Sequence, residues 1–508
     1  MEKSLFLKTF NKYQLGILPT EKPNQDTLGL SELAQNDLNK GLKVLKDVDV
    51  KAIEKLIHKS HEIDLLNQDI QSVLKAGGNI YLCGCGATGR LSLLLEFLWR
   101  EKHGNDRVKA FMAGGDVALV HSLEGFEDFP ELGARHLKQM GFTENDLLIS
   151  CTEGGETPYV IGATEAATQI SKWKPYFLYC NPKELLIEKI ERSKNVLENS
   201  NINNIELFVG SMSLSGSTRM QASTVLQLAV GAALLENDRK AQEVFNEYLE
   251  SLVSLDYLNL SGFIKEEEQT YKNGDYLIYE PKEFAITVFT DTTERSPTFS
   301  LPAFENDDYD GNAPSLCYIL LPDANSKEEA WFYLLKRKPI PLNWPEIDEQ
   351  TTNDYLEKFD FSRSSFGKRQ IRISGKNQKR FHINYENSQL ILKLGNIEGK
   401  FTIDSNSSLI KHSLVKVLLN THSTLLMGRL DRYQSNIMTW VTPTNAKLVD
   451  RATRYILYLL KEKSINVEYL QVVEEVYNFS EKVNNESIVL KVYEHFLNKQ
   501  SPIKEGHV

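Results

Sequence analysis

A glycine-rich turn near residue 85 has the residue types that bind a phosphate group. An apolar run at residues 79–83 leads into glycines at 84, 86 and 89, and a second apolar run follows at 91–97. Glycine lets the backbone turn tightly and approach a ligand, while a helix start offers unpaired N–H groups and positive potential. We therefore expect Gly86, Thr88 and Gly89 to contact a phosphorylated small molecule. A glycine-rich turn that binds no ligand remains the alternative.

Two further turns have similar chemistry. Residues 151–159 are rich in glycine before an expected helix and offer Gly155 and Thr157, and residues 210–219 are dense in serine and offer Ser215 and Ser217. A sugar phosphate needs contacts at both of its ends, so several such turns at one sheet edge favour that ligand class. Helix capping is the alternative role of the serines.

An acidic segment at residues 121–128 could supply a catalytic base. Glu124 and Glu127 are three residues apart, so they share a helix face, and one of them can point towards the phosphate turns. A carboxylate buried beside negative charge gains proton affinity and suits general acid–base catalysis. The alternative is an ordinary solvated helix face.

Composition narrows the class of protein. The 508 residues predict roughly two to four domains. The formal charge of 58 − 69 = −11 disfavours nucleic acid and anionic membranes as partners. Five scattered cysteines and the lack of a leader or membrane-spanning run predict a cytoplasmic protein. We expect Cys83 and Cys85 to pack in the core, and we expect no metal and no cofactor.

The chain order predicts an α/β fold with several regions. Strand-like runs alternate with helical stretches from about residue 48 to 240, which is typical of a parallel sheet covered by helices on both faces. Residues 275–289 resemble residues 79–91 weakly, but Glu280, Pro281 and Lys282 replace the glycines. The polar stretch 348–380 indicates loops around short strands, and residues 409–460 return to helical periodicity. The expected divisions are an N-terminal arm and helix at 1–47, a first domain at 48–240, a degenerate second domain at 241–462 and a helical C-terminal lid at 463–508.

Several of these segments together resemble one family. The matching segments, in the family's order, are residues 18–21, 84–91, 113–116, 124–128, 157–162, 180–182, 215–220 and 444–448. The chain resembles the sugar-isomerase (SIS) fold family that includes bacterial N-acetylmuramic acid 6-phosphate etherase and the vertebrate glucokinase regulatory protein. This resemblance implies two tandem SIS domains, each a flavodoxin-like, doubly wound parallel sheet, plus a small helical C-terminal region.

The resemblance also implies two catalytic glutamates. One of them corresponds to Glu127. The position of the other corresponds to Leu98 in the first domain, and leucine cannot transfer a proton. In the second copy, residues 293–299 resemble the missing string and place a carboxyl group at Glu294. Because the etherase has sites between two subunits, the resemblance implies one composite site shared by the two copies. Departures from the etherase pattern occur at Gly154, Glu156, Gln221 and Ser223.

The function implied by the resemblance is cleavage of the lactyl ether of N-acetylmuramic acid 6-phosphate. Glu127 would remove the proton at C2 and Glu294 would protonate the departing lactate, although the roles could be exchanged. Lys447 and Arg451 would approach the ligand from the C-terminal helices, unless Lys447 is an ordinary surface lysine. The alternative is a non-catalytic regulator that senses a hexose phosphate and binds a sugar kinase. An aldose–ketose isomerase is a third possibility.

Overall fold

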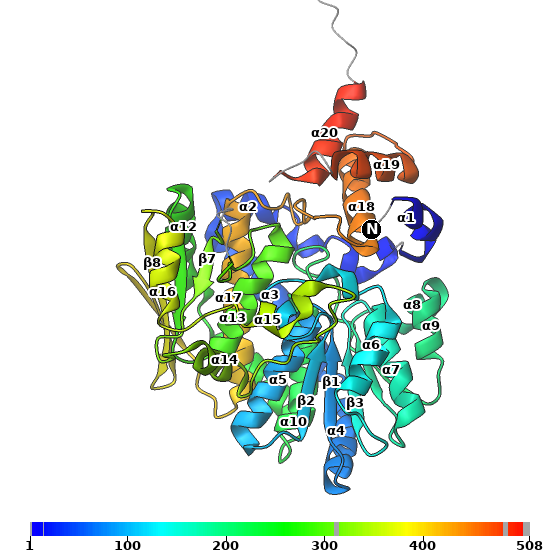
Figure 1. The fold of residues 1–508 in the computed structure, drawn as a ribbon. Coiled ribbons are helices and arrows are strands. Elements are labelled where there is room, and N and C mark those ends of the chain that lie inside the picture. Colours follow the sequence, from blue (N-terminus) through cyan, green and yellow to red (C-terminus); the bar gives the residue numbers. More distant parts are fainter. Residues whose placement is uncertain (1–2, 14, 309–313, 481–485, 501–508) are drawn as a thin grey trace, which may run out of the picture.

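Two five-stranded sheets organise the chain (Figure 1). The computed structural model describes residues 3–13, 15–308, 314–480 and 486–500. The first sheet has the order β2-β1-β3-β4-β5, and all of its neighbouring strands are parallel. Its strands are β1 (Ile80–Gly84), β2 (Val108–Met112), β3 (Leu147–Cys151), β4 (Tyr176–Tyr179) and β5 (Asn203–Glu206).

The first sheet is doubly wound, as the sequence predicts. Every residue of β1, β3 and β4 is buried, because helices cover both faces. The strand order is the flavodoxin-like one, in which ligands bind outside the carboxyl ends of the strands. One face carries α4 (Ser60–Lys75), α5 (Ala87–His103) and α10 (Gln221–Leu235). The other carries α6 (Pro130–Gln139), α7 (Pro158–Ile170), α8 (Lys183–Lys189) and α9 (Glu191–Leu197).

The second sheet is mixed, which corrects the expectation of a second wholly parallel sheet. In the order β10-β9-β8-β6-β7, β6 pairs in parallel with β7 and β8, whereas β8, β9 and β10 pair antiparallel. Asn387 and Ser388 both have positive φ, as a tight hairpin between β8 and β9 requires. The strands are β6 (Tyr276–Pro281), β7 (Cys317–Ile319), β8 (Gln378–Glu386), β9 (Gln389–Leu394) and β10 (Ile397–Thr402).

The polar stretch expected to form loops around short strands is partly helical instead. Its helices are η8 (Glu349–Thr351), α15 (Asn353–Leu356) and α16 (Ser365–Arg372). Other helices of the second unit are α11 (Ala241–Ser254), η7 (Tyr257–Leu260), α12 (Ser261–Lys272), α13 (Ala285–Phe299), α14 (Lys327–Leu335) and α17 (Ser408–Arg429). α17 joins the two units, because it contacts α10 of the first and α12 and α13 of the second. One buried apolar cluster extends through both units.

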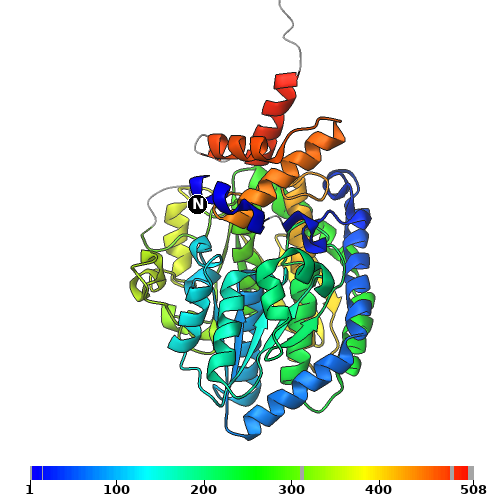
Figure 2. The same ribbon diagram turned by 90° about the vertical axis from the view of Figure 1, so that its right-hand side faces the viewer.

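Segments from both ends of the chain lie near the carboxyl edge of the first sheet (Figures 1 and 2). The N-terminal elements are α1 (Lys3–Thr9), η1 (Phe10–Tyr13), η2 (Leu15–Ile17), η3 (Pro19–Glu21), η4 (Gln25–Thr27), α2 (Leu30–Asn36) and α3 (Leu38–Ile57). α3 runs across the expected boundary between residues 47 and 48. The C-terminal elements are α18 (Ala446–Glu462), α19 (Tyr469–Ser480) and α20 (Ile488–Gln500).

α19 and α20 pack against α18. The last residues of the expected lid, 501–508, lie outside the described residues. In the part of the chain that the structure describes, every helix is too short or too polar to span a lipid bilayer.

Candidate functional site

A cavity of about 1050 Å³, including its opening to solvent, lies at the carboxyl edge of the first sheet and is lined by both units. Glu127 comes from the segment after η6 (Glu124–Phe126), and Glu294 comes from α13 of the second unit. Seven of the eleven residues predicted from sequence line this cavity: Gly86, Glu127, Thr157, Ser217, Glu294, Lys447 and Arg451. The other four, which are Thr88, Gly89, Gly155 and Ser215, lie outside the lining.

The turn before α5 brings its backbone to the cavity. Gly86 has φ 54° and lines the cavity, and a Cβ atom added there would meet nothing within 4 Å. The Thr88 hydroxyl donates to the carbonyl oxygen of Cys85 and accepts from its N–H, both at 2.9 Å. A Cβ atom at Gly89 would lie 2.5 Å from Cβ of Met112, so this glycine allows α5 to pack on β2. Thr88 and Gly89 therefore shape the turn, and of the three predicted residues Gly86 is the one that lines the cavity.

The turn before α7 contributes a hydroxyl and an unexpected carboxyl group. The Thr157 hydroxyl lies 2.9 Å from the Thr152 hydroxyl at the cavity wall. Gly155 has φ 78° and packs against Leu186, where a Cβ atom would come within 2.6 Å of the leucine side chain. Glu153 lines the cavity, and its Oε1 is buried without a hydrogen-bond partner in the described structure. The sequence prediction missed Glu153.

In the serine-rich turn before α10, the Ser215 hydroxyl forms structural hydrogen bonds, whereas Ser217 lines the cavity. The Ser215 hydroxyl donates to the carbonyl oxygen of Glu21 at 2.7 Å and accepts from Tyr455 at 3.1 Å, which ties the turn to α18. Ser217 lines the cavity and is 3% exposed, and its hydroxyl has no partner in the described part of the chain. Between them, Gly216 has φ 72° and lies against Tyr455 and Arg451. Of the two predicted serines, Ser217 is therefore the one that lines the cavity.

Lys447 on α18 is held by acidic neighbours. Its Nζ lies 3.0 Å from Oε1 of Glu127 and 3.6 Å from Oε1 of Glu156. Burial alone would lower the pKa of Lys447, but the carboxylates of Glu127 and Glu156 raise it above its ordinary value. Lys447 is therefore a cation of the cavity wall and not a free surface lysine.

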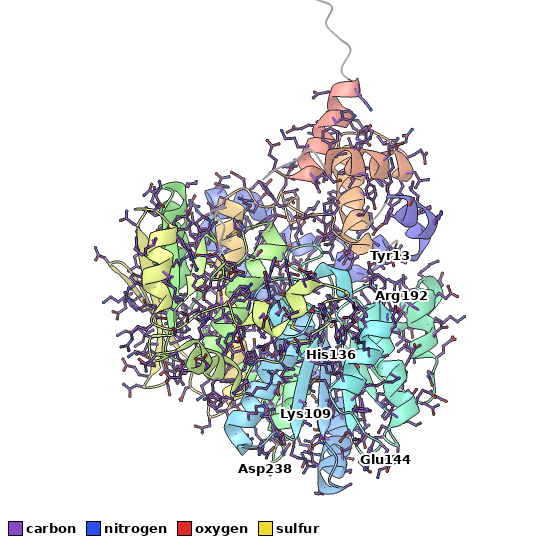
Figure 3. All side chains as sticks on the ribbon, in the orientation of Figure 1. Tyr13, Lys109, His136, Glu144, Arg192 and Asp238 are labelled. Carbon is purple, nitrogen blue, oxygen red and sulfur yellow. The ribbon has the colours of Figure 1, made fainter. Side chains whose placement is uncertain are left out.

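Glu156, one of the expected departures from the etherase pattern, is itself ion-paired. Arg192 donates to both the side chain and the backbone carbonyl of Glu156. The Arg192 guanidinium also lies 5.4 Å from the ring centre of Tyr13, and Figure 3 labels both side chains beside the N-terminal segment. Burial raises the pKa of Glu156, but Arg192 and Lys447 outweigh it and the pKa is lowered. Acidic and basic side chains therefore alternate along this part of the cavity rim.

Arg451 forms a two-pronged ion pair with Glu21. Its Nε and Nη2 lie 3.0 and 2.7 Å from the two carboxylate oxygens, and Arg454 adds a contact at 3.1 Å. Burial would raise the pKa of Glu21, but the two arginines lower it far below its ordinary value. This pair joins the N-terminal segment to α18, so residues 18–21, which match the family pattern, hold the cavity wall in place.

Glu294 differs from Glu127 in its surroundings. Among the described residues, no side chain forms a hydrogen bond or ion pair with its carboxyl group. Burial raises the pKa of Glu294, and the more distant charges of Arg90, Arg219 and Lys416 only partly offset this. Leu98, the family's second position in the first copy, is buried and does not line the cavity. Glu294 therefore adds a carboxyl group from the second unit to the cavity that Glu127 lines.

Two further arginines that the sequence prediction missed line the cavity. They are Arg90, whose Nη2 donates to the carbonyl oxygen of Leu119 at 3.3 Å, and Arg219, which pairs with the buried Asp291 at 3.1 Å. Both lie within the matching segments 84–91 and 215–220, and this position was the signal that could have identified them. No cluster of three or more His, Cys, Asp or Glu side chains with metal-binding geometry occurs in the described residues.

Comparisons with known proteins identify relatives of part of this chain. The glucokinase regulatory protein N-terminal SIS domain family matches residues 64–168. An N-acetylmuramic acid 6-phosphate etherase of Clostridium botulinum (strain Langeland) is 32% identical over 221 residues, which cover 42% of this chain and 66% of that protein. The etherase of Bacillus cereus (strain B4264) is 30% identical over 218 residues, which cover 42% of this chain and 68% of that protein.

The match therefore spans about two thirds of the relatives' length and less than half of this chain. A solved tagatose-6-phosphate ketose/aldose isomerase of Escherichia coli is 11% identical, with a TM-score of 0.40 over 79% of this chain and 97% of that one. The sequence relatives carry the assignment: the chain belongs to the SIS family of the N-acetylmuramic acid 6-phosphate etherases and the glucokinase regulatory protein.

Proposed function

We propose that the protein is an N-acetylmuramic acid 6-phosphate etherase, a carbon–oxygen lyase that yields N-acetylglucosamine 6-phosphate and D-lactate. The observation that carries this proposal is that Glu127 and Glu294, from different units, line one cavity. The etherase relatives support the substrate class.

The reaction needs one base and one acid. In the open-chain sugar the C1 aldehyde acidifies the proton at C2, so a carboxylate can remove it. The electron pair then forms the C2=C3 double bond, the C3–O bond to lactate breaks, and an acid protonates the departing oxygen. Water adds across the double bond to give the product. Two carboxyl groups in opposite protonation states can perform these steps.

The surroundings of the two glutamates favour one assignment. The carboxyl group of Glu127 lies 3.0 Å from Nζ of Lys447, and we assign to it the removal of the C2 proton. Glu294 has no ion pair among the described residues, and burial raises its pKa, which suits a proton donor to the departing lactate.

The phosphate would bind at the glycine and serine turns. Gly86 brings backbone N–H groups at the start of α5, while Thr157 and Ser217 add hydroxyls at the same wall. Lys447 and Arg451 add positive charge from α18. Thr88, Gly89, Gly155 and Ser215 would act through the shape of the turns and not by direct contact.

The test is the release of lactate from N-acetylmuramic acid 6-phosphate by the purified protein, measured with lactate dehydrogenase. In deuterated water the product N-acetylglucosamine 6-phosphate should carry deuterium at C2, because the removed proton is replaced from solvent. Absence of lactate above the rate without protein would reject the proposal. Lactate release without deuterium at C2 would reject the elimination mechanism.

A second candidate is a sugar-phosphate-sensing regulator that binds a sugar kinase. The match to the regulator's N-terminal SIS domain supports it, as does the presence of a second, degenerate unit in the same chain. Such a regulator would use the same cavity for the ligand and would need no acid–base chemistry. A sugar kinase bound by the protein and released by fructose phosphates, together with no lactate production, would favour this candidate.

A further inference from the structure

The cavity contains a third carboxyl group that the proposed reaction does not use. Glu153 lies shortly after β3 (Leu147–Cys151), lines the cavity and is 6% exposed. Its backbone carbonyl accepts from the N–H of Cys180 at 3.0 Å, which fixes the segment beside β4. Its Oε1 is buried without a hydrogen-bond partner in the described structure. A buried polar atom without a partner costs free energy unless a ligand satisfies it.

The charges that face Glu153 do not neutralise it. No basic side chain of the described residues lies within ion-pair distance of Glu153, whereas Glu127 has Lys447 at 3.0 Å. Lys447 on α18 acts on it only at longer range, and Glu294 on α13 and Glu127 repel a negative charge there.

Two buried cysteines are the other titratable neighbours of Glu153. The thiols of Cys151 and Cys180 flank Glu153 at the ends of β3 and β4, and the pKa of each is raised by burial and by Glu153 itself. Burial raises the pKa of Glu153 to about 8, because it outweighs a backbone hydrogen bond to the carboxyl group and the charge of Lys447, which lower the pKa, while Glu294 and Glu127 raise it further. A buried carboxyl group without a counter-ion holds its proton at neutral pH.

We propose that Glu153 is a ligand-binding residue whose protonated carboxyl group donates a hydrogen bond to an oxygen of a bound sugar phosphate. The neutral acid has an O–H donor, and a charge-assisted hydrogen bond to an anionic oxygen is stronger than a neutral one. The ionised form has no donor and repels an anion. Ligand affinity therefore depends on whether the carboxyl group of Glu153 is protonated. This inference uses the substrate class of the proposed function but not its catalytic step.

The test is calorimetric titration of the full chain with N-acetylglucosamine 6-phosphate and with fructose 6-phosphate at pH 7 and pH 9. The protonated fraction of Glu153 falls from about 90% to about 10% over this range, so Kd should rise about tenfold. The phosphate monoester, with a second pKa of about 6, keeps nearly the same charge. At pH 8, titrations in buffers of different ionisation enthalpy should show uptake of about half a proton on binding.

The decisive variant is Glu153→Gln, which keeps a neutral hydrogen-bond donor of similar shape. Its Kd should change less than about twofold between pH 7 and pH 9, with no proton uptake at pH 8. The matched control is Glu165→Gln on α7, because Glu165 also has a pKa raised by burial but lies outside the cavity lining. This control should keep the tenfold dependence of the wild type.

Two results would overturn the inference. One is a wild-type Kd that does not change between pH 7 and pH 9, and this measurement holds even if Glu153→Gln fails to fold. The other is failure of both sugar phosphates to bind. If the protein releases lactate but binds the sugar phosphates independently of pH, the role of Glu153 is rejected and the proposed function stands. If binding is linked to a proton but no lactate is released, the etherase activity is rejected and the role of Glu153 stands.

Discussion

Removal of the Asp291 carboxylate should destabilise the protein strongly, because this group joins the two units through a buried network. Asp291 on α13 accepts from Arg219 at 3.1 Å and from Arg295 at 2.9 Å, and all three side chains are at most 3% exposed. Asp291→Ala leaves two buried guanidinium groups without their shared partner. Loss of one partner of a buried pair costs about 3–5 kcal/mol. Urea unfolding followed by tryptophan fluorescence would measure this loss in the free energy of unfolding.

The matched control is an exposed ion pair of similar length. Lys3 and Glu474 lie 3.0 Å apart, with side chains 37% and 63% exposed, so Glu474→Ala should cost at most about 1 kcal/mol. Because Glu294 follows Asp291 by one helical turn, Asp291→Ala should also lower ligand affinity. A loss of less than about 1 kcal/mol for Asp291→Ala, equal to the control, would refute the view that this network holds α13 in place.

Two further predictions concern the same framework. Gly216→Ala should reduce both stability and ligand binding, because φ is 72° and the new Cβ atom would lie 2.6 Å from the Tyr455 hydroxyl. An unchanged melting temperature together with an unchanged Kd would contradict this prediction. Burial raises the pKa of Glu267, but Arg295 and His422 outweigh burial and lower it from 4.5 to about 2. Glu267 should therefore contribute about 3 kcal/mol above pH 4.5, a contribution lost as the pH falls towards 2. The stability advantage of the wild type over Glu267→Gln should shrink between pH 5 and pH 3, and a constant difference would count against the ion pair.

The first sheet could be predicted from the sequence because its buried strands are continuous apolar runs. β1, β3 and β4 each precede a turn and are buried at every residue. β5 (Asn203–Glu206) lies at the sheet edge and contains two asparagines and a glutamate, so no apolar run marked it. In the second unit, β8 is only partly buried and contains many polar residues. The sequence therefore did not predict the antiparallel hairpin of β8 and β9 that makes this sheet mixed.

The turns of the site could be located from their glycines and hydroxyls, but the role of each side chain could not. Thr88 and Ser215 use their hydroxyls in hydrogen bonds within the protein, whereas the hydroxyl of Ser217 has no hydrogen-bond partner in the described structure. Sequence type does not distinguish these cases, because the difference depends on the hydrogen-bond geometry of the folded turns. Glu153 was missed for a similar reason, since an acidic residue in a glycine-rich turn carries no periodicity that reports burial.

The family pattern placed the second glutamate in the degenerate unit, and the structure brings Glu294 to the cavity that Glu127 lines. This juxtaposition depends on packing between α13 and α5 and on α17, which contacts both units. The hydrophobic periodicity of one segment cannot predict contacts between residues that lie far apart in the sequence. Only the resemblance to the family's two-subunit site supplied that prediction.

The most direct test of the composite site is lactate release from N-acetylmuramic acid 6-phosphate by the wild type, Glu127→Gln and Glu294→Gln at equal concentration. Loss of a general acid or base lowers the rate by about 10²–10⁴-fold, so both variants should fall by that factor while still binding N-acetylglucosamine 6-phosphate. Wild-type turnover by Glu294→Gln would contradict the claim that the second unit lends its carboxyl group to the cavity of the first.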